Sequence, residues 1–200
     1  MTMQEGRMSY EQFTFACANF IKCPQAQIDS WRLEDESHEF GESFLSLSTI
    51  RQTSVPSSGT DADVTVCTVE ESDAGKTDNS FNMKLLQYRF DVLYSVSHCV
   101  PVLYFTISET SGRLLSLDEV WTLFGLQAET DTSLWNVVSW QDHPVLHMPF
   151  LCVHPCSNWA IMKECFQGKE PTCEQFLISW LSFVGNQFGL KLSPAYLLNS

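Results

Sequence analysis

Two neighbouring runs decide the fold of this chain: residues 86–97, LQYRFDVLYSVS, and residues 100–108, VPVLYFTIS. Both are rich in tyrosine, phenylalanine, valine and leucine, the residue types that favour β-strands. Pro101 has no backbone N–H, so we expect it at a position where the sheet needs no donor. The two runs therefore predict a pair of antiparallel strands.

The residues before this pair predict a helix and then a further strand. Ser9 and Gln12 have the spacing of a capping box, in which each side chain bonds the backbone of the other residue. Over 40–50, leucines and serines alternate, which is the pattern of a strand with one solvent-exposed face. Between the two, apolar residues recur at helical spacing until Pro24 ends or interrupts the helix: they are Phe13, Ala16, Cys17, Phe20 and Ile21.

The residues after the pair predict further helices. Capping boxes begin at Ser116 and at Thr172, and the second opens a long apolar helix that Gly189 can end. The order is helix, antiparallel strands and helices again, which is typical of an α+β domain. We expect residues 1–200 to form a single domain, because a chain of this length can bury one substantial core.

The composition makes a nucleic-acid partner unlikely on physical grounds and predicts one irregular segment. The chain has 24 acidic and 11 basic residues, and its formal net charge is −13. Nucleic-acid binding depends on basic side chains that neutralise phosphates, so we expect no such partner. Residues 52–82 are rich in glycine, serine and acidic residues, which predicts an acidic flexible loop or insert with a short strand over 64–69.

The cysteines and the apolar runs bear on location. The N-terminus lacks the pattern of a secretion signal, and the longest apolar run, 176–190, is too short and too polar to span a bilayer. Eight cysteines without a Cys-x-x-Cys pair indicate reduced thiols. We therefore expect a cytoplasmic protein without stable membrane insertion.

The stretch 151–156, LCVHPC, places a thiol in an unusual setting. Pro155 fixes its own φ angle and favours an extended conformation for His154, so Cys156 follows a stiff segment. A second His-Pro dipeptide, His143-Pro144, lies upstream. Buried packing is the expected role of the other cysteines, including Cys152, which lies in an apolar run.

Two chemical roles for Cys156 are open on these residues. Cys152, His154 and Cys156 alternate and could share one side of an extended segment as zinc ligands, although no paired ligands follow. Alternatively, Cys156 carries an acyl group, because the start of a following helix would lower the pKa of its thiol and donate N–H groups to developing negative charge.

The same residues resemble a known family, the autophagy conjugating enzymes, which are distant relatives of ubiquitin-conjugating enzymes. The resemblance covers about residues 9–196 and rests on the His154-Pro155-Cys156 motif with His143-Pro144 upstream, on residues 92–105, and on 179–185 near the C-terminus. It implies a ubiquitin-conjugating-enzyme-like α+β fold. Such a fold has an N-terminal helix, an antiparallel sheet of four or slightly more strands, and C-terminal helices.

The resemblance also implies an activity, without a cofactor or metal. Cys156 would accept the C-terminal glycine of autophagy-related protein 12 from the activating enzyme, autophagy-related protein 7. It would then transfer that glycine to a lysine of autophagy-related protein 5. The alternatives are the family branch that conjugates a ubiquitin-like protein to phosphatidylethanolamine, and a non-enzymatic adaptor stabilised by zinc.

One position departs from the wider pattern. Ubiquitin-conjugating enzymes carry asparagine after the upstream His-Pro and use it to support the oxyanion, whereas this chain has Val145. Loss of one such donor costs about 10²–10³ in rate, so we expect another group to supply it. The candidates are Asn136, Tyr94 and Asn158, while we expect His154 and Pro155 to support Cys156 through orientation of its turn.

Overall fold

The computed structural model describes residues 7–34, 43–56, 81–125, 138–155, 162, 164–167 and 169–198. The helices are α1 (Tyr10–Lys22), α2 (Pro24–Ile28), α3 (Leu117–Leu123), α6 (Cys173–Gln187) and α7 (Ala195–Leu198). The strands are β1 (Arg32–Glu34), β2 (Phe44–Pro56), β3 (Phe81–Ser95), β4 (Val100–Glu109), β5 (Val138–Asp142) and β6 (Pro149–Val153). The fold is α+β, as the sequence predicts.

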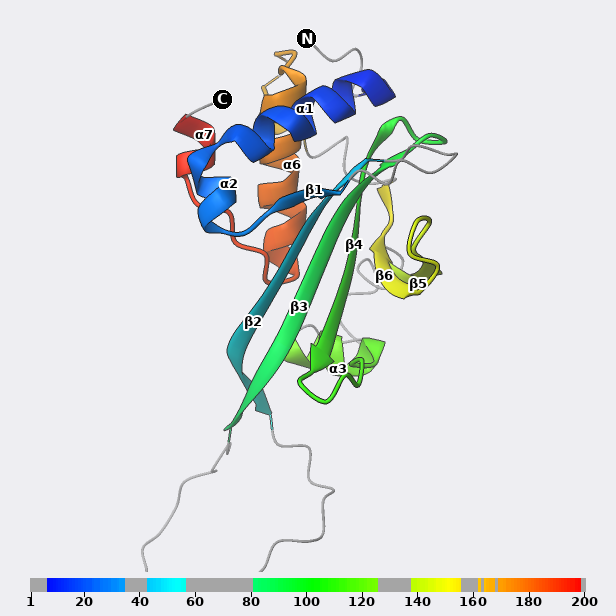
Figure 1. Ribbon diagram of the computed structural model, residues 1–200, viewed down its shortest axis with the longest axis vertical. Coiled ribbons are helices and arrows are strands. Elements are labelled where there is room, and N and C mark those ends of the chain that lie inside the picture. The colour runs from blue at the N-terminus through cyan, green and yellow to red at the C-terminus, as the bar shows by residue number, and fades with distance from the viewer. Residues whose placement is uncertain are drawn as a thin grey trace, which may run out of the picture.

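All described strands pair antiparallel in one six-stranded sheet of order β1-β2-β3-β4-β6-β5. The strands β2, β3 and β4 form a long meander, which Figure 1 shows running the length of the molecule. The β5–β6 hairpin joins the sheet through β6, whose register with β4 is Tyr104↔Cys152 and Phe105↔Leu151. The sheet is thus larger than the four strands of the basic expectation.

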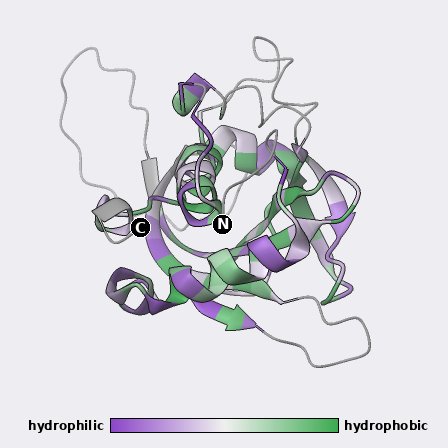
Figure 2. Cartoon of the chain, turned by 90° about the horizontal axis from the view of Figure 1, so that it is seen from above, coloured by the Kyte–Doolittle hydropathy of each residue, from purple (hydrophilic) through white to green (hydrophobic). Residues whose placement is uncertain are grey.

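Helices α1 and α6 pack against each other and cover one face of the sheet, as Figure 1 shows. Alternate strand residues point into this core, among them Leu45 in β2, Phe90 in β3, Phe105 in β4 and Leu151 in β6. Figure 2 shows hydrophobic and hydrophilic residues interspersed along the same elements, which is the consequence of this one-sided burial. We call this cluster the main core.

The intervening strand residues form a second, smaller cluster on the opposite face. It lies beneath the β5–β6 hairpin and is described as Phe44, Leu93, Val102, Tyr104, Phe150 and Cys152. Val145 and Leu146, from the turn that joins β5 to β6, pack against it. We call it the second cluster. The central strands are therefore buried on both faces where the hairpin crosses them.

The predicted helix boundaries are confirmed by their geometry. The side chains of Ser9, Ser116 and Thr172 each accept a hydrogen bond from the backbone three residues later, and all three capping boxes are complete. Gly189 follows α6 with a φ of 80°, a conformation that glycine adopts at little cost. Pro24 does not merely end a helix, since α2 begins at it.

The predicted loop over 52–82 has a strand at each end. The strand β2 continues to Pro56, and β3 begins at Phe81. Residues 57–80, with the short strand expected over 64–69, lie outside the described residues, so the flexible loop and the single domain stay predictions. Within the part of the chain that the structure describes, no helix is both long enough and apolar enough to cross a membrane.

Candidate functional site

Strand β6 brings the His-Pro-Cys motif to one end of the sheet. Leu151 and Val153 face the main core, while Cys152 belongs to the second cluster on the other face. His154 and Pro155 follow directly and are half-buried. Cys156 lies outside the described residues, as do the oxyanion candidates Asn136 and Asn158. The structure therefore describes the approach to the predicted thiol.

A cavity of about 440 Å³ opens where β6 ends, and we call it the β6-end cavity. It contains residues from three places in the chain: the end of β3 with the turn after it, strand β4, and the β5–β6 hairpin with the two residues that follow it. Its lining includes the apolar residues Leu93, Val96, Val102 and Pro144, and the polar or ionisable residues Ser95, Ser97, His98, Tyr104, Gln141, Cys152 and His154, with Tyr94 and Pro155 completing it. Because Pro155 is part of its wall, the residue next in the chain, Cys156, is bonded directly to this cavity's lining.

Cys152 has the properties of a structural thiol. Its side chain is 3% exposed and lies in the second cluster, opposite Tyr104 in the register. Burial raises the pKa of the Cys152 thiol to about 11, although a hydrogen bond with Tyr104 acts in the other direction. A thiol with this pKa is almost entirely protonated near neutral pH, so it is a poor nucleophile.

We predict that Cys152→Ser leaves thioester formation intact and lowers the free energy of unfolding by about 1–3 kcal/mol, because it buries a hydroxyl in an apolar site. Thioester formation is read on a non-reducing gel and stability by urea unfolding. The raised pKa also means that Cys152 contributes stability below pH 9 that is lost as the pH rises toward 11. Loss of the thioester in a variant that remains folded would identify Cys152 as the acyl carrier instead.

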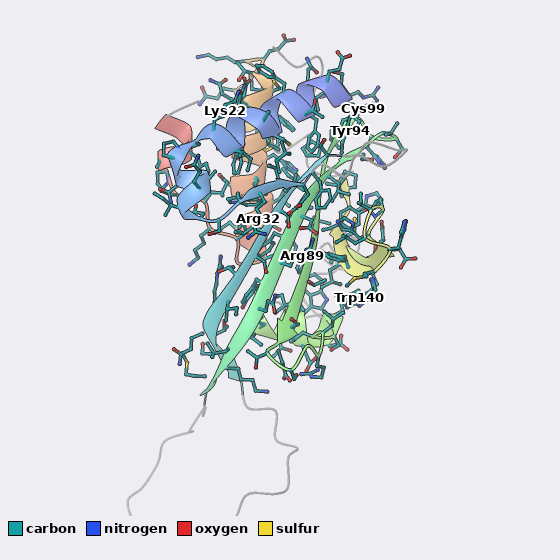
Figure 3. The ribbon with its side chains drawn as sticks, viewed as in Figure 1. Lys22, Arg32, Arg89, Tyr94, Cys99 and Trp140 are labelled. Atoms are coloured by element: carbon teal, nitrogen blue, oxygen red, sulfur yellow. The ribbon has the colours of Figure 1, made fainter. Side chains whose placement is uncertain are left out.

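Tyr94 lies at the same end of the sheet, and Figure 3 shows it near Cys99 and the start of α1. Its hydroxyl donates a 2.7 Å hydrogen bond to the carbonyl of Met8, and its ring contacts Tyr10 and Phe13. Burial raises the pKa of Tyr94 to about 12. Its predicted oxyanion role stays a prediction, and that role would require the hydroxyl to release Met8.

The upstream dipeptide His143-Pro144 begins the turn that joins β5 to β6. The His143 ring is fully buried, and its Nδ1 accepts hydrogen bonds from the backbone N–H groups of Leu146 (3.1 Å) and Val145 (3.3 Å). The His143 N–H also donates to the carbonyl of Met148 at 2.8 Å. These hydrogen bonds from the ring and backbone of His143 stabilise the turn, which is a structural role for this residue.

A buried carboxylate lies beneath His143. The Nε2 atom of His143 is 3.3 Å from Oδ2 of Asp91, without the alignment of a full hydrogen bond, and both side chains have no exposed surface. Arg89 donates from Nε to the same carboxylate at 2.9 Å. The two backbone donors at Nδ1 assign the proton of the neutral ring to Nε2, so it faces the carboxylate.

Aromatic rings surround His143 in this group. The rings of Phe44, Tyr104 and Phe150 lie 4.8–5.4 Å from the ring of His143, measured between centroids. Water is thus excluded from the contact between Asp91 and His143, which strengthens their interaction and makes an unpaired partner costly. We call Arg89, Asp91 and His143 the Asp91 triad.

The three residues of this triad are not predicted by the sequence motifs described above. Its signal is present in the strand pattern, because Asp91 interrupts the apolar run of β3 at a position where both neighbours are buried. A charged residue there needs a partner, and Arg89, two residues away, shares its face. The contribution of His143 depends on the β5–β6 crossover, which local pattern does not reveal.

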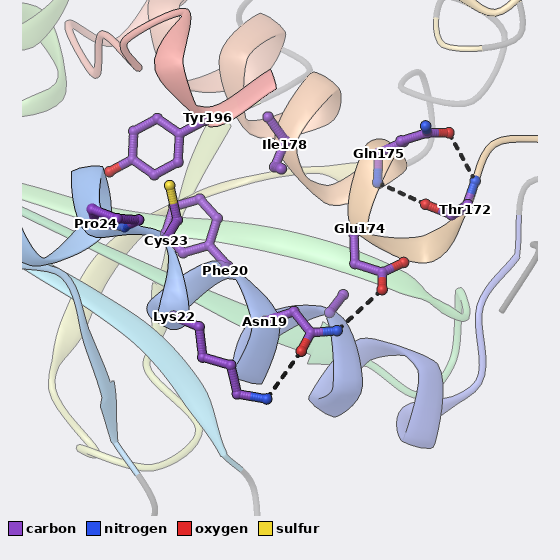
Figure 4. A pocket seen from close by; sticks show the side chains of 11 residues that line it. Asn19, Phe20, Lys22, Cys23, Pro24, Thr172, Glu174, Gln175, Ile178 and Tyr196 are labelled. Carbon is purple, nitrogen blue, oxygen red and sulfur yellow. Dashed lines mark hydrogen bonds between the residues drawn. The ribbon is translucent and has the colours of Figure 1, made fainter. Parts of the chain in front are cut away.

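A second cavity, of about 470 Å³, lies between α1, α6 and α7, and Figure 4 shows it from close by. Asn19 donates to Glu174 at 3.1 Å and accepts from Lys22 at 3.2 Å along its wall. None of the predicted site residues that the structure describes lines it. It therefore has no evident part in the chemistry expected of the His-Pro-Cys motif.

Zinc binding by Cys152, His154 and Cys156 is the alternative hypothesis for the motif. In the described ranges, no group of three or more histidine, cysteine, aspartate or glutamate side chains is placed to hold a metal ion. Because Cys156 is outside these ranges, the zinc hypothesis remains open to direct metal analysis.

Comparison with known proteins places the motif in a family. Residues 12–195 match the model of the family described as autophagocytosis associated protein, active-site domain. The chain is similar to the Homo sapiens ubiquitin-like-conjugating enzyme ATG10, with 29% identity over 214 residues, which cover 96% of this chain and 91% of the human protein. The enzyme of the same name from Arabidopsis thaliana is 33% identical over 56% of this chain and 52% of its own length. The one from Dictyostelium discoideum is 29% identical over 58% of this chain and 56% of its own length.

Proposed function

This chain belongs to the autophagocytosis-associated active-site-domain family, and from that premise we propose that it is a ubiquitin-like-conjugating enzyme whose acyl carrier is Cys156. The observation that carries the proposal is the match of residues 12–195, which include the whole His154-Pro155-Cys156 motif. The location of Pro155 in the wall of the β6-end cavity supports it, because the residue bonded to Cys156 borders a space that a substrate can enter. The names of the similar proteins support a conjugating role in autophagy.

The proposed chemistry has two steps. In charging, the thiolate of Cys156 attacks the thioester that joins the ubiquitin-like protein to its activating enzyme, and the glycyl group moves to Cys156. In discharge, a lysine nitrogen attacks the new thioester, an amide bond forms and the thiolate leaves. Only about 0.1% of a lysine with an ordinary pKa of about 10.4 is neutral near pH 7.4, so discharge needs positioning and proton removal.

The proposed partners follow from the family resemblance. Cys156 receives the C-terminal glycine of autophagy-related protein 12 from autophagy-related protein 7 and passes it to a lysine of autophagy-related protein 5. The reaction uses no metal or organic cofactor and takes place in the cytoplasm. The acidic character of the chain, with its net charge of −13, favours docking to basic or mixed partner surfaces.

In this proposal the oxyanion is supported by a residue other than the one that follows the upstream His-Pro dipeptide. Val145 supplies no side-chain donor, and the backbone N–H groups of Val145 and Leu146 already bond His143. Asn136 and Asn158 are therefore the candidates with side-chain amides, and Tyr94 is the candidate with a hydroxyl. His154 and Pro155 are assigned the orientation of the turn that carries Cys156.

Reconstitution tests the function and separates its alternatives. The purified chain is mixed with the activating enzyme, ATP and either autophagy-related protein 12 or the ubiquitin-like protein of the lipid branch. The proposal expects a reductant-sensitive adduct with the first protein, followed by its transfer to autophagy-related protein 5. Transfer to phosphatidylethanolamine in vesicles instead would assign the chain to the lipid branch, and stoichiometric zinc without any adduct would support the adaptor.

A further inference from the structure

A cavity of about 300 Å³ lies where the turn after α2 and the residues after α6 meet the middle of β2. We call it the Arg51 cavity, and we propose that it binds the phosphoryl group of a small soluble phosphate monoester between Arg51 and Lys191. It shares no lining residue with the β6-end cavity, so the proposal goes beyond the function proposed above and does not depend on Cys156.

Arg51 is the first of the two basic groups, and its guanidinium is held in place. Its Nη1 donates to the carbonyl of Gly189, and its Cζ lies 5.4 Å from the centroid of the Tyr88 ring. The ion pairs that the described residues form do not include Arg51. A guanidinium has five N–H donors, so a group fixed by one hydrogen bond keeps others for a ligand.

Lys191 is the second basic group; it is exposed and also takes no part in the ion pairs of the described residues. Asp29 is the carboxylate in the same wall. Its Oδ1 accepts from Nε2 of Gln25 at 2.9 Å, and its Oδ2 accepts from the hydroxyl of Tyr196 at 2.8 Å. Because neutral donors hold both oxygens, the cavity brings together two cations that no carboxylate pairs directly, which favours an anionic ligand.

Two hydroxyl groups add donors that suit a phosphoryl group. Ser30 and Thr49 line the same cavity, and Ser30 has a φ of 67°, a left-handed conformation that is uncommon for serine. A phosphoryl group has three terminal oxygens and a charge of about −1.5 to −2 at neutral pH, so it can accept from Arg51, Lys191 and a hydroxyl at once. A carboxylate has two oxygens in one plane, which the fork of Arg51 alone would occupy.

The volume of the cavity and the charge of the chain indicate a small soluble ligand. Pockets for small molecules have volumes of about 300–1,000 Å³, so the Arg51 cavity lies at the small end of that range. A phosphorylated lipid head group would have to be bound at an anionic membrane surface, which repels a chain with a net charge of −13. A small phosphate monoester fits the volume and needs no membrane.

Calorimetric titration of the full chain tests the site. The ligands are inorganic phosphate, glycerol 3-phosphate, acetate as a carboxylate, and phosphatidylcholine vesicles that contain phosphatidylinositol phosphate, all at one ionic strength. The variants are Lys191→Gln, Ser30→Gly and Arg51→Gln. The matched control is Lys169→Gln, which removes the charge of an exposed lysine that does not line the cavity.

We expect inorganic phosphate and glycerol 3-phosphate to bind at a single site and acetate not to bind. Lys191→Gln should weaken the binding of both phosphates about tenfold, and Arg51→Gln about 10–100-fold, since each removes a hydrogen bond to a charged group. Ser30→Gly should weaken it about threefold to tenfold through the loss of a hydroxyl donor. Lys169→Gln should bind both phosphates as the unmodified chain does.

Urea unfolding checks that each variant is folded. Arg51→Gln loses the contacts with Gly189 and Tyr88, so this variant is the one whose folding is at risk. Lys191→Gln changes an exposed side chain, and Ser30→Gly places glycine at a φ that glycine adopts readily. These two variants decide the test if Arg51→Gln does not fold.

Three results would overturn the proposal: no binding of either phosphate by the unmodified chain, equal binding of acetate, or an equal loss in Lys169→Gln. Binding of the vesicles without binding of the soluble phosphates would overturn it in favour of a membrane site. A failure to form the thioester would count against the proposed function alone, because the titration does not use Cys156.

Discussion

Replacing Cys156 by serine is expected to convert the labile thioester into a stable oxyester with the ubiquitin-like protein. A serine hydroxyl can take the glycyl group slowly, but an alkoxide leaves far less readily than a thiolate, so discharge onto lysine should stop. The adduct should persist on a reducing gel, whereas the adduct of the unmodified chain should disappear. With Cys156→Ala no adduct should form, because the acyl carrier is absent.

The matched control for this prediction is Cys165→Ser. Cys165 is an exposed cysteine in the same part of the chain, so a general effect of removing an accessible thiol would appear there as well. Normal charging of Cys165→Ser with no charging of Cys156→Ala would support Cys156. A reductant-sensitive adduct that survives in Cys156→Ala would assign the acyl group to another thiol.

The second large effect is expected at the Asp91 triad. Replacing His143 by alanine removes one of the two partners of the Asp91 carboxylate, leaves it to Arg89, and opens a space among Phe44, Tyr104 and Phe150. Losing a buried ring of this size together with its polar contact costs about 2–5 kcal/mol. Because domains of this kind are stable by only about 5–15 kcal/mol, urea unfolding should show a large loss. The turn around Pro144 should also loosen, and with it one wall of the β6-end cavity.

A double substitution separates the stability that comes from the contact between Asp91 and His143 from the stability that comes from packing of the His143 ring. His143→Leu combined with Asp91→Leu removes both partners, and Arg89 can then turn to solvent because its side chain is 34% exposed. The double variant should be more stable than the sum of its single variants predicts, because each single variant leaves the remaining partner without the contact between Asp91 and His143. Additive losses would show that Asp91 and His143 do not interact. His147→Asn, in the same turn but exposed, should leave stability almost unchanged.

The sequence predicted those parts of the fold that are encoded locally. Capping boxes at Ser9, Ser116 and Thr172 are patterns of four residues, and the structure confirms each of them. The strand pair around residues 86–108 was equally visible, because its residue types and length are strong signals. Strand β1 was missed, since three residues carry too little pattern, and β3 ends at Ser95 because the following turn closes there.

Only those parts of the candidate site that are adjacent in sequence could be predicted. The resemblance assigned Cys156 and its neighbours by motif. Alternation allowed Cys152 and His154 to share one side of an extended segment, and both line the β6-end cavity. The contact of His98 with His154 and the contact of Asp91 with His143 both join distant segments. Such pairs arise from the sheet order, so no local spacing predicts them, and a single sequence does not show which buried charge has which partner.

The position of β6 in the sheet bears on how the chain reaches this structure. The meander β2–β3–β4 can form from strands that are neighbours in sequence. Tyr104 in β4, however, pairs with Cys152 in β6, which lies much later in the chain. Closing that long loop costs entropy before any pairing compensates for it, so this step should be slow relative to formation of the meander. The strand that leads to the His-Pro-Cys motif is therefore expected to join the sheet late in folding, and the edge of β4 stays unpaired until then.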